Sequence, residues 1–408
     1  MLTCPPSRRG GSAAWAGFEG MVAVAKRDAI CIEGGTVVLP AKTVERGSVH
    51  IGDGKIVHAG ARRARPRGAT VIDATGRIVA PGLIDVHIHG AGEFSFELLD
   101  ADGFVAAARF LAMHGVLRFL PTMMADEGVI ERTACALEEG RLDDACPGIY
   151  IEGPFVSPDK RGGIQKQYVR GVDLAYLRKL HALARGRLKM MTFAPELSRA
   201  EVLVARLRRM KILPCLGHTL ATAKRAADVC GRGVVNVTHL FNAMSGLDHK
   251  EPGVAVFGLD NDRAWVELNP DGVHVAPELL RLVARAKDSD RIVLITDAVV
   301  SAGTRGGTFV YMGRKVRATA DGVRYADEGT LVGSRLLLCQ SVAAYMKHTG
   351  AALHDAVRAA SLNPARMLGI AKHTGSLEKG KRADVVVMKR DLSRATHAIC
   401  GGVRVAWR

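Results

Sequence analysis

Two histidines at the end of an apolar run are the first residues of this chain whose spacing suits chemistry. The stretch is Pro81-Gly-Leu-Ile-Asp-Val-His87-Ile-His89-Gly90. In a β-strand, residues i and i+2 lie on one face, so both imidazoles point the same way. Imidazole is a common transition-metal ligand, and two rings on one face can hold one ion. On its own, however, a His-X-His pair is more often hydrogen-bonded or solvated than bound to metal.

Four further residues that could bind metal or move protons also follow apolar runs. They are Glu152 in Ile-Glu-Gly-Pro, His218 in Leu-Gly-His-Thr, His239 in Val-Thr-His-Leu and Asp297 in Ile-Thr-Asp-Ala. Nitrogen and oxygen donors without thiolates suit zinc, with iron(II) or manganese as alternatives. We therefore predict one or two divalent ions per chain, with zinc favoured.

A two-ion arrangement needs a ligand that both ions share, and a carboxylate can bridge them. The first ion would be held by His87, His89 and Glu152. The second would be held by Glu152, His218 and His239. A metal lowers the pKa of bound water from about 15.7 toward 7 and so produces a nucleophile at neutral pH. The residues therefore predict metal-assisted hydrolysis.

The elements that must position these residues are eight apolar, strand-like runs that alternate with amphipathic helical stretches. The runs cover residues 82–89, 117–123, 148–153, 188–194, 212–218, 234–239, 264–268 and 292–297. Eight β/α units in succession predict a (β/α)8 TIM-like barrel, whose strands are buried on both faces. Active sites of such barrels lie where strands end, and the candidate residues fall there. Asp297, at the end of the last run, is expected to act as general base and then as general acid.

Short β-like runs precede and follow the barrel. The Asp53-Gly54 pair between two of them is a strong hairpin signal, because a type I′ turn needs a positive φ at both central positions. We predict that residues 28–80 and 371–408 together form a small β-sandwich beside a barrel of residues 81–370. Residues 1–27 are expected to be a disordered leader, unless Met21 is the true start.

Composition and charge narrow the class of protein. The 408 residues are 48% hydrophobic and 24% charged, as in an ordinary globular protein, and no apolar run reaches the ~18 residues that span a bilayer. The eight scattered cysteines form no C-x-x-C pair, which favours reduced thiols and a cytoplasmic protein. The net charge of +16 suits an anionic small substrate. Its basic groups lack interleaved aromatic residues, so we expect neither a nucleic-acid partner nor a membrane.

The motifs taken together resemble the amidohydrolase superfamily and, within it, the N-acetylglucosamine-6-phosphate deacetylase family. The resemblance covers residues 28–400. Its motifs are the His-X-His stretch, Glu152-Gly-Pro-Phe, Gly217-His-Thr, Thr238-His-Leu-Phe-Asn-Ala-Met, His249-Lys-Glu-Pro-Gly, Asp271-Gly-Val-His, Thr296-Asp-Ala and Ser361-Leu-Asn-Pro-Ala. It implies hydrolysis of the N-acetyl group of an amino-sugar phosphate, which releases acetate and the free amine.

The resemblance also implies roles for individual residues. It implies metal binding by Glu152, His218 and His239, and acid/base catalysis by Asp297. Retention of the His-X-His pair favours two ions over one. The substrate-binding residues that it implies are Asn242, Ala243, Lys250, His274 and Leu331. It further implies a homodimer in which the partner completes the phosphate pocket, with His274 reaching the phosphate.

Two positions depart from the family pattern. Lys250 stands where members usually carry arginine, which keeps the charge but loses bidentate contact with phosphate. Ile164 stands where members carry a histidine that touches the sugar, and an isoleucine cannot hydrogen-bond a hydroxyl. N-acetylgalactosamine 6-phosphate, another acylated amino sugar and an unphosphorylated substrate therefore stay open. A cyclic-amide or N-acyl-amino-acid hydrolase is the rival enzyme, and a non-catalytic binding protein is the rival from another class.

Overall fold

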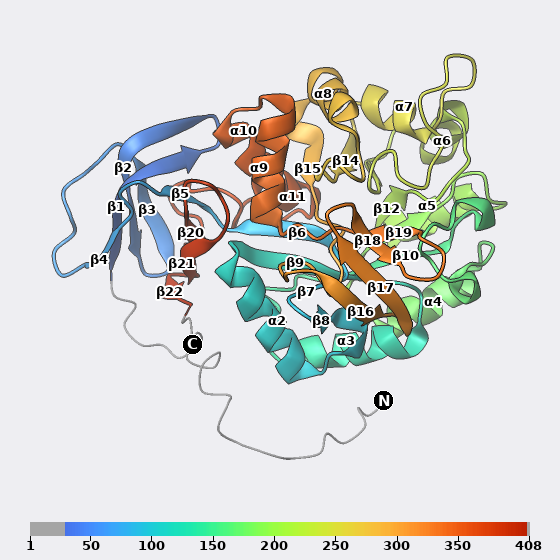
Figure 1. The fold of residues 1–408 in the computed structure, drawn as a ribbon, viewed down its shortest axis with the longest axis horizontal. Coiled ribbons are helices and arrows are strands. Elements are labelled where there is room, and N and C mark those ends of the chain that lie inside the picture. The colour runs from blue at the N-terminus through green and yellow to red at the C-terminus, as the bar shows by residue number, and fades with distance from the viewer. Residues whose placement is uncertain (1–28, 406–408) are drawn as a thin grey trace.

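The computed structural model describes residues 29–405 of the chain. The predicted leader, residues 1–27, lies outside the described residues. None of the helices in the described part combines the length and apolar character that a membrane crossing requires. Figure 1 shows two units side by side, a β-rich one built from both ends of the chain and a larger one of strands and helices.

The larger unit contains the eight predicted parallel strands, which pair in chain order. They are β6 (Leu83–Ile88), β9 (Val116–Met123), β10 (Ile149–Phe155), β11 (Leu188–Phe193), β12 (Leu213–Leu216), β13 (Val235–Val237), β14 (Ala264–Leu268) and β15 (Ile292–Leu294). A parallel bridge between Ile88 and Ala298 joins the first strand to the segment after the last. The TIM-like barrel predicted from the apolar runs is confirmed.

Helices follow the strands and cover the outside of the barrel (Figure 1). They are α2 (Ala101–Met113), α3 (Glu127–Glu139), α4 (Leu174–Leu183), α5 (Ala200–Arg209), α6 (Ala223–Cys230), α7 (Val254–Asp260), α8 (Pro277–Ala286), α9 (Leu338–Thr349), α10 (Leu353–Ala359) and α11 (Leu362–Met367). Side-chain caps fix several starts: Asp100 accepts from the Gly103 amide and Asp126 from the Val129 amide. The apolar faces of these helices pack on the strands in one continuous core.

The smaller unit joins strands from both ends of the chain, as predicted. Its members are β1 (Ile30–Leu39), β2 (Lys42–Gly52), β3 (Lys55–Gly60), β4 (Thr70–Asp73), β5 (Ile78–Pro81), β20 (Val385–Met388), β21 (Ala395–Cys400) and β22 (Val403–Arg404). They form one mixed sheet in which β20 pairs with β5. Asp53 and Gly54 both have positive φ, which confirms the predicted tight hairpin.

Alternation along β5 and β20 explains how this sheet serves two cores. Val79, Val385 and Val387 point into the sheet's own apolar cluster. Ala80 and Val386 point the other way and join the core of the barrel. Because successive side chains of a strand face opposite sides, this pair of strands packs against both cores and joins the two units.

A four-stranded antiparallel sheet between β15 and α9 was not predicted. It consists of β16 (Gly307–Tyr311), β17 (Arg314–Thr319), β18 (Gly322–Tyr325) and β19 (Leu331–Gly333), and it lies across the front of the barrel in Figure 1. The Asp321-Gly322 pair between two alternating runs is the same turn signal as at Asp53-Gly54, so the sequence did carry a sign of it.

Candidate metal-dependent active site

The six candidate ligands and catalytic groups gather where barrel strands end. His87 lies in β6 and Glu152 in β10, whereas the other four lie one to three residues beyond the ends of strands; the six are His87, His89, Glu152, His218, His239 and Asp297. Each is at most 9% exposed. They form two groups whose ligand atoms lie within 4.8 Å of one another, namely His87 with His89 and Asp297, and Glu152 with His218 and His239.

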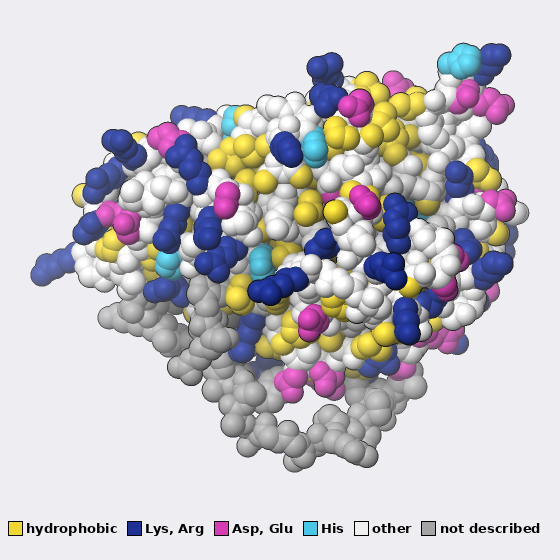
Figure 2. Space-filling view, in the orientation of Figure 1, with side chains coloured by type: hydrophobic (Ala, Val, Ile, Leu, Met, Phe, Trp, Pro, Cys, Tyr) yellow, Lys and Arg dark blue, Asp and Glu magenta, His cyan; other side chains and the backbone are white. Residues whose placement is uncertain are grey.

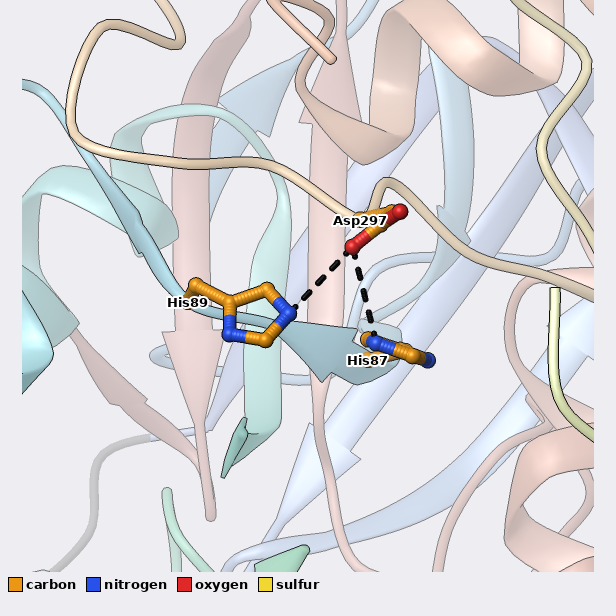
Figure 3. A group of neighbouring side chains, drawn as sticks. All are labelled: His87, His89 and Asp297. Carbon is orange, nitrogen blue, oxygen red and sulfur yellow. Dashed lines mark ion pairs between the residues drawn. The ribbon is translucent and has the colours of Figure 1, made fainter. Parts of the chain in front are cut away.

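The first group is drawn in Figure 3, where both imidazoles turn toward the same carboxylate. The Oδ1 atom of Asp297 lies 3.5 Å from Nε2 of His87 and 3.3 Å from Nε2 of His89. The sequence placed Asp297 as an acid/base only. Its position among the imidazoles makes it a possible ligand as well.

Glu152 forms the centre of the second group and also contacts the first. Its Oε1 lies 3.0 Å from Nε2 of His218 and 2.9 Å from Nε2 of His239. Its Oε1 is also 3.6 Å from Nε2 of His87, and its Oε2 is 3.5 Å from Nε2 of His89. A carboxylate between two sets of imidazoles is the arrangement that a shared ligand requires.

Hydrogen bonds on the far side of two rings orient the ligand nitrogens. Nδ1 of His218 donates to the backbone oxygen of Lys160 over 2.8 Å, and Nδ1 of His87 donates to Oε2 of Glu267 over 2.8 Å. Such bonds leave the lone pair of Nε2 facing the site. Nε2 of His87 is buried and has no hydrogen-bond partner in the described part of the chain. A buried nitrogen in this state fits a metal ligand.

Glu267 was not singled out in the sequence, although its carboxylate accepts hydrogen bonds from both His87 and His239. Its Oε2 also accepts from the amide of His239 over 3.1 Å, and its Oε1 accepts from Nδ2 of Asn236 over 2.7 Å. The residue is fully buried. A charged residue inside the apolar run Ala264–Leu268 was the available signal, because glutamate is almost never buried unless it is paired.

The electrostatics of the cluster favour a cation. Burial raises the pKa of Asp297, but the imidazoles of His87 and His89 outweigh it and hold the pKa well below the usual aspartate range. Burial likewise opposes ionisation of Glu152, yet the contacts of its carboxylate with the imidazoles of His218 and His239 place its pKa well below normal. Both carboxylates are therefore ionised at neutral pH, and they attract positive charge to the imidazoles.

Three site residues adopt a backbone conformation that is uncommon outside glycine. The φ angles of His218, His239 and Asp297 are 49°, 27° and 49°, in the left-handed region. Such conformations cost free energy and persist where the surrounding structure demands them, often at functional sites. Each occurs two or three residues after the end of a barrel strand, where it turns the chain sharply while the side chain stays directed at the cluster.

A cavity of about 340 Å³ opens over the cluster. Four predicted substrate-binding residues line it, namely Asn242, Ala243, His274 and Leu331. The amide of Ala243 donates to no acceptor in residues 29–405. Lys250 is not among the lining residues; it lies on an exposed turn, where its amide donates to Asp248. The binding roles of all five residues stay predictions.

His274 lies close to Asp297. Its Nδ1 donates to Oδ2 of Asp271 over 2.7 Å, and its Nε2 lies 3.8 Å from Oδ2 of Asp297. Burial raises the pKa of Asp271, but the hydrogen bond and charge of His274 lower it more, so Asp271 is ionised at neutral pH. The carboxylate therefore fixes the ring with Nε2 toward the cavity.

Lys160 is a cavity residue that the sequence did not single out. Lys160 is among the lining residues, and its ammonium forms no ion pair with a carboxylate in the described residues. Lys160 lies in the short loop after the Glu-Gly-Pro motif, and its own backbone carbonyl accepts the hydrogen bond that orients His218. The only signal was the cluster of basic residues Lys160-Arg161. An unpaired ammonium in the cavity suits an anionic substrate group.

The remaining positive charge is spread out. Figure 2 shows Lys and Arg side chains scattered over the visible face, with Asp and Glu between them. That face therefore has no continuous basic groove of the kind that follows a nucleic-acid backbone.

Comparisons with known proteins agree with this geometry. The pattern of the amidohydrolase family matches residues 78–403. The chain is 32% identical to N-acetylglucosamine-6-phosphate deacetylase of Bacillus subtilis (strain 168), covering 89% of this chain and 94% of that protein. It is 33% identical to N-acetylgalactosamine-6-phosphate deacetylase of Escherichia coli O157:H7, covering 80% and 88%.

A solved structure is similar over nearly the whole fold. A variant of N-acetyl-D-glucosamine-6-phosphate deacetylase from Mycobacterium smegmatis, in complex with N-acetyl-D-glucosamine-6-phosphate, superimposes with a TM-score of 0.86 at 29% identity. The match covers 93% of this chain and 100% of the other.

Proposed function

The chain belongs to the amidohydrolase family and, within it, to the N-acetylglucosamine-6-phosphate deacetylases, and on this premise we propose that it hydrolyses the N-acetyl group of an amino-sugar phosphate. The products are acetate and the amino-sugar phosphate. The observation that carries the proposal is the convergence of two His/carboxylate groups on one cavity, with Glu152 between them.

The residues fit a pair of divalent ions. His87, His89 and Asp297 would hold one, and Glu152, His218 and His239 the other, with Glu152 in reach of both groups. Nitrogen and oxygen donors favour zinc, with iron(II) or manganese as alternatives. A divalent ion supplies Lewis acidity there, which polarises an amide carbonyl and acidifies water.

The proton transfers are assigned to Asp297. It is ionised and lines the cavity, so it can accept a proton from the water that attacks the acetamide carbon. When the C–N bond breaks, the same carboxyl returns the proton to the departing nitrogen. Acetate and a free amine result, and the carboxylate is regenerated.

His274 is assigned to the reacting group. Its Nε2 lies 3.8 Å from Asp297, and the Asp271 carboxylate holds the ring with that nitrogen toward the cavity. When the ring carries its second proton, Nε2 held in this way can donate and stabilise negative charge that develops on the acyl oxygen. This position favours the acyl oxygen over the phosphate as its partner.

The phosphate is assigned to the side of the cavity that carries Lys160, Asn242 and Ala243. Within residues 29–405, Lys160 pairs with no carboxylate and the Ala243 amide donates to no acceptor. In the homodimer that we propose, Lys250 of each copy would extend from its exposed turn toward the phosphate bound by the other. Each of these donors suits a phosphate oxygen.

The leading substrate is N-acetylglucosamine 6-phosphate, and N-acetylgalactosamine 6-phosphate is the second candidate. Relatives named for both reactions are similar to this chain at 32% and 33% identity. The shared ligand here is a glutamate followed by Gly-Pro, whereas many cyclic-amide hydrolases use a carboxylated lysine, which argues against that rival.

The test is acetate release by the metal-loaded chain from both phosphorylated sugars and from their unphosphorylated forms, with and without chelator. We expect chelator-sensitive turnover of one phosphorylated sugar, which identifies the substrate. A metal-loaded chain that releases acetate from none of the four would refute the proposal and direct attention to cyclic amides and N-acyl amino acids.

A further inference from the structure

One part of the cavity lining is apolar. It contains Met124, Ile164, Leu331 and Val332. Ile164 is 2% exposed and packs with Met124 and Val156, so its side chain is fixed in a hydrophobic cluster. A sugar hydroxyl placed against such side chains would lose its hydrogen bonds to water without replacement. This part of the cavity needs a polar group if it faces a ring hydroxyl.

Tyr311, the last residue of β16, brings a hydroxyl to this lining. The next residue, Met312, packs on the cluster of Ile164. Tyr311 is 3% exposed and lines the cavity, and its ring forms a T-shaped contact with the His89 ring, with 6.2 Å between centroids. Its hydroxyl has no hydrogen-bond partner in residues 29–405.

Most other tyrosine hydroxyls of the chain have a protein partner, unlike that of Tyr311. The hydroxyls of four of them bond to protein groups, namely those of Tyr150, Tyr168, Tyr176 and Tyr325. Tyr345 shares the lack of a partner, but its ring lies in the core of the barrel. The Tyr311 hydroxyl is not among the fully buried atoms that lack a partner, so it is open to the cavity and free to bond to a ligand there.

The position of Tyr311 is fixed by contacts on its neighbour. The Met312 amide donates to Oε1 of Glu97 over 3.0 Å, and the Met312 carbonyl accepts from Nε2 of Gln165 over 2.9 Å. The loop that contains Gln165 is itself held by a 3.2 Å hydrogen bond, which the Tyr325 hydroxyl donates to the Gly163 carbonyl. A donor fixed before binding loses little entropy when the ligand arrives.

Tyr311 also remains a donor at neutral pH. Burial raises the pKa of its hydroxyl well above the usual value. The phenol therefore stays protonated and carries a hydrogen to donate.

We propose that the Tyr311 hydroxyl donates a hydrogen bond to a ring hydroxyl of the amino-sugar phosphate and thereby determines which sugar is accepted. This rests on the proposed function: the acetamide lies at the metal ligands and the phosphate near Lys160, which leaves the ring hydroxyls to meet the rest of the lining. Thr330 is the other hydroxyl there, and it is more exposed.

The experiment compares wild type with Tyr311→Phe on the preferred sugar phosphate and on its 1-, 3- and 4-deoxy analogues. Removing a hydrogen bond between neutral groups is expected to lower kcat/KM by about tenfold, mainly through a higher KM. On the one analogue that lacks the recognised hydroxyl, both proteins should have equal kcat/KM, because the bond is already missing. A residue with only a structural role would lower kcat/KM for every analogue alike.

The matched control is Tyr345→Phe, which removes a hydroxyl that has no protein partner in residues 29–405 and lies outside the cavity, and which should leave kcat/KM unchanged. Both variants should melt at or above the wild-type temperature, since neither hydroxyl has a protein partner. If the wild type is active but Tyr311→Phe matches it on the full substrate, or loses equally on all analogues, the Tyr311 proposal is wrong and the deacetylase proposal stands. A wild type that hydrolyses no amino-sugar phosphate overturns both.

Discussion

Replacing Asp297 with asparagine tests the assigned acid/base most sharply. Asparagine keeps the shape of the side chain but has no charge and accepts no proton at neutral pH. General acid/base catalysis is worth about 10²- to 10⁴-fold. That range corresponds to about 3–5.5 kcal/mol of transition-state stabilisation, and we expect kcat to fall by this amount.

The same substitution also separates the two groups of ligands. Oδ1 of Asp297 lies 3.5 and 3.3 Å from the ligand nitrogens of His87 and His89, whereas Glu152 is the carboxylate of the other group. Elemental analysis of Asp297→Asn should therefore find the ion of the Glu152 group retained and the other one weakened or lost.

The assay is acetate release under saturating substrate, with circular dichroism to confirm the fold. Asp102→Asn removes an exposed carboxylate from the first turn of α2 and serves as the control, with activity expected within about twofold of wild type. If folded Asp297→Asn kept a kcat within about tenfold of wild type, the acid/base assignment would be refuted.

Three further outcomes follow from the structure. Glu267→Gln removes the charge opposite His87 and should lower metal affinity by about 10- to 100-fold in a chelator competition. Unchanged metal affinity would refute the role of Glu267 in orienting His87 as a metal ligand. Lys160→Met should raise KM about 10- to 100-fold for the phosphorylated sugar and leave any turnover of the unphosphorylated sugar unchanged; an equal rise for both would place Lys160 elsewhere. Asp384→Asn breaks a buried 2.6 Å pair with Arg118 and should cost about 3–5 kcal/mol in denaturant unfolding at pH 7. Burial raises the pKa of Asp384 but the Arg118 charge lowers it more, so the folded pKa is below the unfolded value of about 3.9. The pair's stabilisation is then complete above about pH 4 and lost as the pH falls through the folded pKa, and the variant should lack this part of the acid sensitivity.

The barrel could be predicted because its strands are buried on both faces and leave uninterrupted apolar runs. The residues that end these runs, such as His218 and Asp297, were recognisable for the same reason. The Asp53-Gly54 hairpin was predictable because its turn chemistry is local. In each case the signal lies within a few neighbouring residues.

The parts that were missed depend on contacts between distant segments. Glu267 reaches His87 across 180 positions of sequence, and Tyr311 reaches the cavity only because the inserted sheet folds over the barrel. Lys160 is one basic residue among many in a chain of +16 until the structure shows that it faces the cavity without a carboxylate partner. Tertiary placement gives these residues their importance, and no local pattern records it.

The most direct measurement is a metal titration of the apoprotein, followed by acetate release from N-acetylglucosamine 6-phosphate and N-acetylgalactosamine 6-phosphate. We predict no turnover without metal, and a rise to full turnover of one of the two sugars as the ions bind. Metal binding without acetate release from either sugar would contradict the proposed function.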